Sequence, residues 1–377
     1  MRELHKIDKR GSLVIITIAD LHFGALDPKV QYEIIKEQFI DEINKLPLVD
    51  IISINGDLFD RRSMSDSDAT LYASMFMADI RTVAINKNAS VILISGTKQH
   101  DADQLKIFYH YLNDPSFDLR IVENIQFEYV KGARVLCIPE LYNIPEEVYS
   151  NFLKYSGTYD LCMMHGTFEG AIYGNNAGLS RLFTIEDFGN CLGPISSGHV
   201  HVPGCLNRDF YYCGSPLRWK FGEEQTKGFM IFLYDMDTRY YYTHMIPIES
   251  FRYITVNIDH IIDSDPKVII DYINNLKETQ NIHYLRLEIK SDANADTMNI
   301  IKEYFHTNNT VKFKQEKAVK PNGVQNNDGT ISSYDDYSYL FDPSLNEYDR
   351  LAKYINDREG SIIVNADTIK SILEEQI

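Results

Sequence analysis

Short apolar segments recur through the first two thirds of this 377-residue chain, and each has the length of a buried strand. They are LVIITIA (13–19), DIISI (50–54), VILIS (91–95), RVLCI (134–138), DLCMM (160–164) and PISS (194–197). Between the early ones, 29–46 carries one helical stripe of apolar residues, and 68–86 predicts a second helix. Strands that alternate with helices predict a layered α/β fold, with ligands bound where the carboxyl ends of the strands meet loops.

Potential metal ligands follow nearly every one of these strands. They are Asp20 and His22, Asp57 and Asp60, His100 and Asp101, His165, and His199 and His201. One histidine after a strand is usually a loop residue, and one Gly-Asp pair is usually a turn. Five such sets at successive strand ends are hard to explain in that way, so the pattern predicts a metal site.

The residue types in these sets indicate the chemistry of the site. Mixtures of carboxylate and imidazole suit divalent ions such as Mn²⁺, Fe²⁺ or Zn²⁺, and one aspartate can bridge two ions. A pair of ions about 3.5–4 Å apart can hold the attacking and the leaving oxygen of an in-line phosphoryl displacement. The residue set therefore predicts phosphoester hydrolysis.

The net charge of -17, from 37 basic and 54 acidic residues, disfavours any partner that is held mainly by a basic surface. A polyanionic substrate would need bound cations, a local basic patch or a separate subunit. The five cysteines show no CxxC spacing, and the polar start of the chain leads into an apolar run too short for a signal segment or a membrane span. We expect an intracellular, cytoplasmic protein with reduced thiols and no membrane association.

Four regions are predicted along the chain. Residues 1–250 form the main domain, and at 251–319 the pattern becomes strand, helix, strand, helix, strand, which predicts a small second domain. Residues 320–339 are polar and turn-rich and predict a linker. Two short helices are expected within 340–377, with apolar stripes formed by Leu345, Tyr348, Leu351 and Ile355 and by Ile369, Ile372 and Leu373.

At the strand ends the chain resembles the calcineurin-like metallophosphoesterase superfamily. The family blocks DxH, GDxxD, GNHD, H and GHxH are matched here by DLH, GDLFD, QHD, His165 and GHVH. The resemblance implies a layered β-sandwich core flanked by helices, a small α+β capping domain and a C-terminal helical pair. It also implies two divalent ions, Mn²⁺ first with Mg²⁺ or Fe²⁺ as alternatives. One ion would be held by Asp20, His22 and His201 and the other by His165 and His199, with Asp57 bridging.

The third block departs from the family, because GTKQHD stands where the family has GNHD. Gln99 takes the place of the asparagine and keeps its carbonyl oxygen, but it adds a methylene in a longer loop, so metal ligation by Gln99 stays open. The resemblance makes His100 the general acid that protonates the leaving oxygen, oriented by Asp101. The alternative for His100 is a phosphate-contacting or structural loop residue.

Two neighbouring residues have weaker assignments. Asp60 either orients a ligand histidine from behind or caps the turn, and Arg61 either contacts phosphate or is an exposed charge.

Within the superfamily, the chain is most similar to the SbcD-type nuclease subunit of double-strand-break repair. The resemblance rests on GDLFDRR, HGTFEG, SGHVH, YYCGSPLRW (211–219) and KGF (227–229), and it extends over about 13–230. It implies a DNA exonuclease or endonuclease whose helical tail binds the coiled coil of an SbcC-type ATPase, with a homodimer as a further possible assembly.

Two other classes of function stay open at this point. A stand-alone phosphodiesterase or phosphatase is favoured by the acidic charge, whereas the second domain and the helical tail count against it. A non-catalytic binding protein on the same scaffold is supported only by the Gln99 change. The altered third block would fit a virus-encoded copy.

Overall fold

The computed structural model describes nine segments of the chain and four single residues. These are 12–61, 67–101, 103–169, 181–206, 209–223, 225–280, 282–289, 294–306 and 310–315, with residues 349, 352, 365 and 370. The chain divides into two compact units, Met1–Glu316 and Lys317–Ile377. The predicted linker at 320–339 and all residues of the two tail stripes lie outside the described residues.

The first of two six-stranded sheets is built around four parallel strands. Its order is β14 (Tyr241–Ile248), β13 (Lys227–Asp235), β1 (Ser12–Ile18), β2 (Ile51–Asn55), β3 (Ser90–Ile94) and β4 (Leu119–Val122). Strands β1 to β4 are parallel, whereas β13 runs antiparallel to both β1 and β14. The carboxyl ends of β1, β2 and β3 therefore share one edge of the sheet.

The second six-stranded sheet is also built around four parallel strands. Its order is β11 (Gly204–Cys205), β12 (Phe210–Tyr212), β10 (Ile195–Gly198), β7 (Leu161–His165), β6 (Ala133–Ile138) and β5 (Gln126–Val130). Strands β6, β7, β10 and β12 are parallel. A separate pair, β8 (Thr167–Phe168) and β9 (Leu182–Phe183), follows β7.

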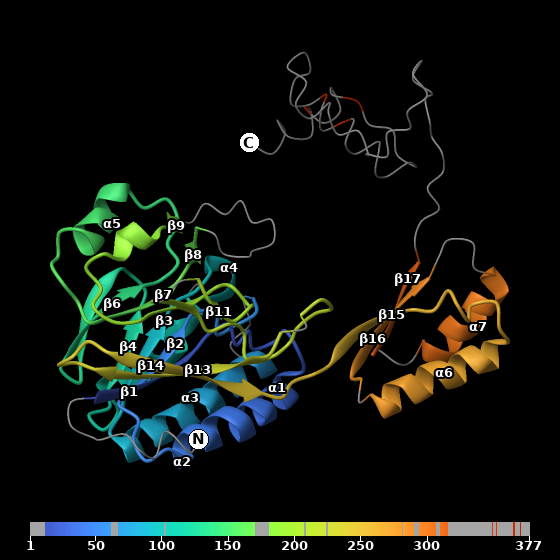
Figure 1. The fold of residues 1–377 in the computed structure, drawn as a ribbon, viewed down its shortest axis with the longest axis horizontal. Helices are drawn as coiled ribbons and strands as arrows, with labels where there is room; N and C mark the ends of the chain where they lie inside the picture. The colour runs from blue at the N-terminus through green and yellow to red at the C-terminus, as the bar shows by residue number, and fades with distance from the viewer. Residues whose placement is uncertain are drawn as a thin grey trace. The chain divides into compact units, whose positions relative to one another are not determined.

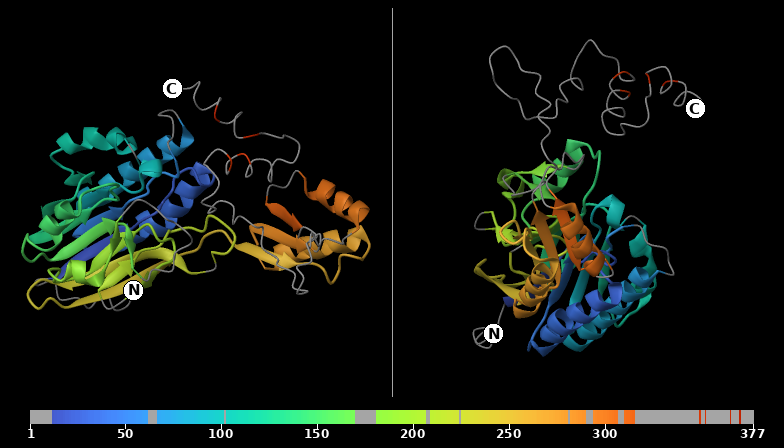
Figure 2. Two further views of the ribbon diagram at one scale, coloured as in Figure 1. Left: turned by 90° about the horizontal axis from the view of Figure 1, so that it is seen from above. Right: turned by 90° about the vertical axis from the view of Figure 1, so that its right-hand side faces the viewer.

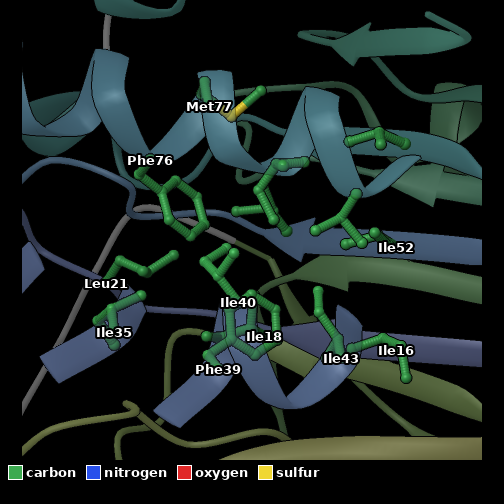
Figure 3. Packing of buried hydrophobic residues seen from close by; sticks show 14 of the residues in the cluster. Ile16, Ile18, Leu21, Ile35, Phe39, Ile40, Ile43, Ile52, Phe76 and Met77 are labelled. Carbon is green, nitrogen blue, oxygen red and sulfur yellow. The ribbon is translucent and has the colours of Figure 1, made fainter. Parts of the chain in front are cut away.

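Alternate residues of each strand face different cores, as the twofold period of a strand requires. Leu13 and Ile15 of β1 share an apolar cluster with Val135 of β6 and Met163 of β7, so this core lies between the two sheets. On the other face of β1, Ile16 and its neighbours pack against helices (Figure 3). The outer face of the second sheet packs against a third cluster that includes Tyr149 and Leu153 of α5 (Glu146–Leu153). The layers are thus helices, sheet, sheet and helix, a mixed α/β architecture.

Helices cover one face of the first sheet (Figure 1), and their sequences explain where they begin and end. Asp27 caps α1 (Pro28–Ile35) by accepting hydrogen bonds from the next turn, and Pro28 takes a position where no N–H is needed. The helix continues through a π-helical turn, Lys36–Ile40, into α2 (Asp41–Lys45). Ser67 caps α3 (Asp68–Lys87), and Asn88 ends it in the left-handed conformation. Both helices predicted for this region are confirmed.

Shorter helical segments connect the remaining strands. They are α4 (Lys98–Asp101) and the 3₁₀ segments Gln104–Asn113 and Ile185–Phe188.

Residues 253–315 contain the predicted order of strand, helix, strand, helix, strand. The elements are β15 (Tyr253–Asn257), α6 (Pro266–Thr279), β16 (Tyr284–Ile289), α7 (Ala295–Phe305) and β17 (Val311–Gln315). The strands are all parallel, and both helices lie beside them (Figure 2). Alternate residues of β16 share a separate apolar cluster with these helices. Because each helix crosses between neighbouring parallel strands, this region is α/β rather than the expected α+β.

Two further observations concern the whole of the described chain. All five cysteines are free thiols, and Cys137, Cys162 and Cys213 are buried, as the sequence predicts. Among the described helices, each is too short or too polar to cross a membrane.

Candidate metal centre

The loops after β1, β2 and β10 hold several candidate ligands in an unusual backbone conformation. Asp20, His22, Asp57 and His199 have positive φ values of 53°, 49°, 51° and 84°. Such a conformation is uncommon for residues other than glycine, and it persists only where surrounding contacts enforce it. Here the first two loops are tied together, because the Asp20 N–H donates to the Gly56 carbonyl at 3.0 Å and the His22 N–H to that of Asp57 at 2.9 Å.

The first cluster consists of Asp20, His22 and His201, whose donor atoms lie within 4.8 Å of one another. The Nε2 atoms of His22 and His201 face each other at 3.0 Å, and His201 Nε2 is 3.9 Å from Asp20 Oδ1. Asp20 is fully buried and also accepts the backbone N–H of His199, which ties the β10 loop to the β1 loop. Asp20 therefore joins the two sheets at this edge.

Two buried residues that were not among the predicted site residues contact His201. Glu223 Oε1 lies 3.6 Å from His201 Nδ1, and Lys227 Nζ donates to the His201 carbonyl at 2.7 Å. A carboxylate behind a histidine favours a proton on Nδ1 and leaves the Nε2 lone pair for a metal ion. Glu223 and Lys227 also lie 3.7 Å from each other, so the lysine charge is buried beside a carboxylate.

The second cluster consists of Asp57, His165 and His199. His165 Nε2 lies 3.3 Å from Asp57 Oδ2 and 3.3 Å from His199 Nδ1. His165 Nδ1 donates to the Asn55 carbonyl at 2.7 Å, which assigns the proton to that nitrogen. Nε2 then faces a carboxylate oxygen, a contact that a second ring proton or a bound cation would stabilise.

The two clusters adjoin through Asp57. Its Oδ2 is 3.3 Å from His165 Nε2 and 3.9 Å from His22 Nε2, so it faces a histidine of each cluster. The other oxygen, Oδ1, accepts the Thr97 N–H at 2.6 Å. Asp57 is thus placed between two groups of donor atoms.

Glu140 is a further acidic residue of this site that the sequence analysis missed. It lies two residues beyond β6, is 8% exposed, and places Oε2 3.1 Å from His199 Nδ1. The Thr97 hydroxyl lies 2.9 Å from Glu140 Oε2 and 3.1 Å from Asp57 Oδ2, and it can donate its hydrogen bond to either oxygen. The available signal was its position after an apolar strand, the same signal that pointed to the other ligands.

Burial and neighbouring charge set the protonation of these groups. Burial lowers the pKa of His22 to about 3, so this imidazole is neutral and able to ligate at physiological pH. Burial by itself would raise the pKa of Asp57, but the adjacent His165 outweighs it and lowers that pKa. In the same way, the hydrogen bond with His199 and the charge of His165 overcome burial and lower the pKa of Glu140 to about 2.

His100 lies at the rim of the clusters, with a partly exposed side chain. Its Nδ1 contacts the carbonyl of Asp60, and its Nε2 is 4.0 Å from Asp57 Oδ2. The orienting contact expected from Asp101 is therefore made by the Asp60 backbone instead. The buried Asp101 carboxylate accepts the backbone N–H groups of Phe59 and Gly96, and burial raises its pKa to about 7.

The remaining predicted residues lie further out. Gln99 is exposed on α4 and lines the cleft above the clusters. The Asp60 side chain lies 3.7 Å from Arg61, which is exposed, and Asp60 also forms a third group of potential ligands with His22 and His100.

The cleft over both clusters has a volume of about 780 Å³. Residues 219–223 and Gln225 also line it; Lys220 is exposed, and Trp219 packs edge-on against His22. Because Gln99 and Lys220 in its lining are exposed, the cleft opens to solvent.

The arrangement fits divalent metal ions. The described residues include clusters of histidine and aspartate whose donor atoms converge and that could bind a metal ion. Imidazole nitrogens with carboxylate oxygens suit Mn²⁺, Fe²⁺ or Zn²⁺ better than Ca²⁺, which prefers oxygen alone.

Comparison with known proteins adds little to this description. Neither the protein-family models nor the curated proteins include a match to the chain. Among solved structures 19 chains match, and one of them superposes with a TM-score of 0.34 at 10% identity, covering 62% of this chain and 99% of that one. A TM-score at this level does not establish a common fold, so the site is interpreted from its own geometry.

Proposed function

We propose that this chain is a dinuclear-metal phosphodiesterase that hydrolyses DNA. The observation that carries the proposal is the pair of adjoining clusters, Asp20 with His22 and His201 and Asp57 with His165 and His199. Two adjacent sites with a shared carboxylate are the arrangement that phosphoryl displacement needs, because both the attacking and the leaving oxygen must be held. Mn²⁺ is the ion that we expect, with Mg²⁺ or Fe²⁺ as alternatives.

The roles of the chain's own residues follow from their positions. Ions bound by the two clusters would supply the positive charge that stabilises the phosphoryl oxygens during displacement. Asp57 would hold the pair together, since its Oδ2 faces both clusters. With Nδ1 of His100 engaged by the Asp60 carbonyl, Nε2 is the atom that would carry a proton to the leaving oxygen.

The finer assignment follows the sequence resemblance. We infer a layered metallophosphoesterase core of the SbcD type, in which the two facing sheets would correspond to the β-sandwich of that family. DNA would enter the cleft beside Lys220, and an SbcC-type ATPase bound by the tail would supply the positive surface that a chain of charge -17 lacks. Action in DNA end processing, repair or recombination is part of this proposal.

The test compares the purified chain with Asp57→Asn on a labelled DNA duplex with Mn²⁺. Asparagine keeps the shape and tolerates the left-handed backbone of this position, but it removes the charge. Loss of several kcal/mol of metal-based stabilisation should lower the cleavage rate by at least about 10³-fold. Equal thermal transitions of the two metal-free proteins would show that the fold is intact. A metal-loaded variant that cleaves at the wild-type rate would contradict the dinuclear mechanism.

The acidic charge favours one alternative, a phosphodiesterase or phosphatase for small or protein substrates. The same cleavage assay distinguishes this alternative from the DNA nuclease. Cleavage of a chromogenic phosphodiester with no cleavage of DNA, with and without a coiled-coil ATPase, would support the alternative and contradict the nuclease assignment.

A further inference from the structure

Glu140 stands where the two sheets meet at their ligand-bearing edges. It follows β6 of the second sheet, and its backbone N–H donates to the carbonyl of Ser95, just past β3 of the first sheet, at 3.4 Å. The carboxylate points toward the cluster of Asp57, His165 and His199, with Oε2 3.1 Å from His199 Nδ1 and 3.7 Å from His165 Nε2. One buried carboxylate oxygen thus contacts both histidines of that cluster.

The distances match those between ligands of a single ion. Donor atoms about 2.1 Å from one ion and about 90–109° apart are separated by about 3.0–3.4 Å. In this cluster, the two histidine nitrogens are 3.3 Å apart, and Glu140 Oε2 is 3.1 Å from one of them. The separation of 3.7 Å from His165 Nε2 is only slightly wider. Glu140 Oε2 therefore occupies a ligand position relative to both histidines.

The second oxygen of Glu140 is also engaged, which fixes the orientation of the carboxylate. Oε1 accepts the hydroxyl of Tyr142 at 3.0 Å, and Oε2 is within reach of the Thr97 hydroxyl at 2.9 Å. Ligating carboxylates are commonly held in this way by partners behind them.

We propose that Glu140 is a ligand of the ion held by Asp57, His165 and His199, in the role that the resemblance leaves to Gln99. This inference rests on the proposed two-ion function. Gln99 is exposed on α4, whereas Glu140 is buried against the cluster. A second carboxylate makes this ion site more anionic and harder in donor character, which favours Mn²⁺ and Mg²⁺ over softer ions.

The competing role for Glu140 is that of a positioning residue, which accepts a hydrogen bond from His199 Nδ1 and does not touch the ion. The two roles differ in the number and affinity of bound ions, and metal binding can be measured without any substrate.

The experiment titrates the metal-stripped full chain with Mn²⁺ by calorimetry, with the stoichiometry measured by elemental analysis. The variants are Glu140→Gln and Glu140→Ala, and Glu128→Gln on β5 is the matched control, because Glu128 pairs with Arg120 away from the site. We expect two ions in the wild type and in the control. In both Glu140 variants, one ion should bind as in the wild type, and the other should bind about 10–100-fold more weakly.

Electron paramagnetic resonance of bound Mn²⁺ gives an independent readout. The wild type should show a spin-coupled pair, and the Glu140 variants at limiting Mn²⁺ should show isolated ions. Thermal transitions of the metal-free variants check the fold, and Glu140→Gln serves if the alanine variant does not fold.

Two ions bound with wild-type affinity in both Glu140 variants would overturn the ligand assignment while leaving the two-ion function standing. Fewer than two ions in the wild type would overturn the two-ion function itself, so the two failures are distinguishable.

Discussion

One ring nitrogen of His100 contacts the backbone, and the other faces the two clusters of candidate metal ligands. Its Nδ1 contacts the carbonyl of Asp60. A carbonyl oxygen accepts a hydrogen bond and cannot donate one, so Nδ1 carries the ring proton at this contact. Its Nε2 lies 4.0 Å from Asp57 Oδ2 in the wall of the cleft. A histidine held in this way can transfer a proton from Nε2 without losing its orientation.

We expect His100→Asn to lower turnover of DNA by about 10²–10⁴-fold, the usual contribution of a general acid or base. Mn²⁺ binding, measured by calorimetry, should stay close to that of the wild type, because both clusters of three ligands are complete without His100. His110→Asn, an exposed histidine on the following 3₁₀ segment, is the matched control and should be neutral. Loss of a metal ion in His100→Asn would contradict the assignment and make His100 a ligand.

Among the individual site residues, the sequence revealed the histidines more readily than the acidic residues. His22, His165, His199 and His201 stand out because histidine is rare in the chain and recurs at strand ends. Glu140, Glu223 and Lys227 belong to common residue types, and their importance depends on burial, which the sequence does not display. Their contacts also join segments far apart in the chain, and short motifs do not report such pairings.

Glycines at the strand ends allow the two sheets to approach. A Cβ atom on Gly198, the last residue of β10, would lie 2.2 Å from the Asn55 carbonyl oxygen and 2.8 Å from His165 Nδ1. A Cβ on Gly56 would lie 2.2 Å from the same histidine nitrogen. These glycines are therefore required for the hydrogen bond between His165 and Asn55 that orients the ligand.

We predict that Gly198→Ala lowers the free energy of unfolding by about 1–3 kcal/mol, the usual cost of overpacking a filled core. The displaced His165 should also weaken Mn²⁺ binding. Gly204→Ala on β11 is the control, since a Cβ there meets nothing within 4 Å and the residue should tolerate it. Thermal unfolding with and without Mn²⁺ measures both effects. Equal stability and metal affinity of the two variants would show that the close approach at Gly198 is not needed.

Six of the eight parallel strands in the two large sheets were predictable, whereas β4, β12 and the antiparallel strands were not. Strands β1, β2, β3, β6, β7 and β10 are buried on both faces, so they appear as continuous apolar runs in the sequence. Strand β14 is largely exposed or half-buried, and it pairs with β13, a late segment that itself lies beside β1. Sheet order of this kind depends on contacts between distant segments, which the local pattern does not encode.

For the whole molecule, the charge of -17 means that the proposed DNA binding would need bound cations, a local basic patch or a partner with a basic surface. The predicted docking tail lies in the second compact unit, Lys317–Ile377, and the residues of its two apolar stripes lie outside the described residues. Short amphipathic helices are marginal alone and gain stability in a partner's groove.

Deleting 340–377 should therefore leave cleavage of short oligonucleotides within about twofold of the wild type, because both clusters of candidate metal ligands lie in the first unit. Binding to a coiled-coil ATPase, measured by size-exclusion chromatography of the mixture, should be lost. Aggregation of the truncated chain, or loss of its thermal transition, would instead show that the tail belongs to the fold of this protein.

The most direct measurement of the two-ion site is the anomalous diffraction of crystals grown with Mn²⁺. We predict two peaks about 3.5–4 Å apart. One should lie among Asp20, His22 and His201, and the other among Asp57, His165 and His199, which are the two groups of donor atoms that the structure brings together. A single peak, or peaks remote from Asp57, would contradict the dinuclear phosphodiesterase.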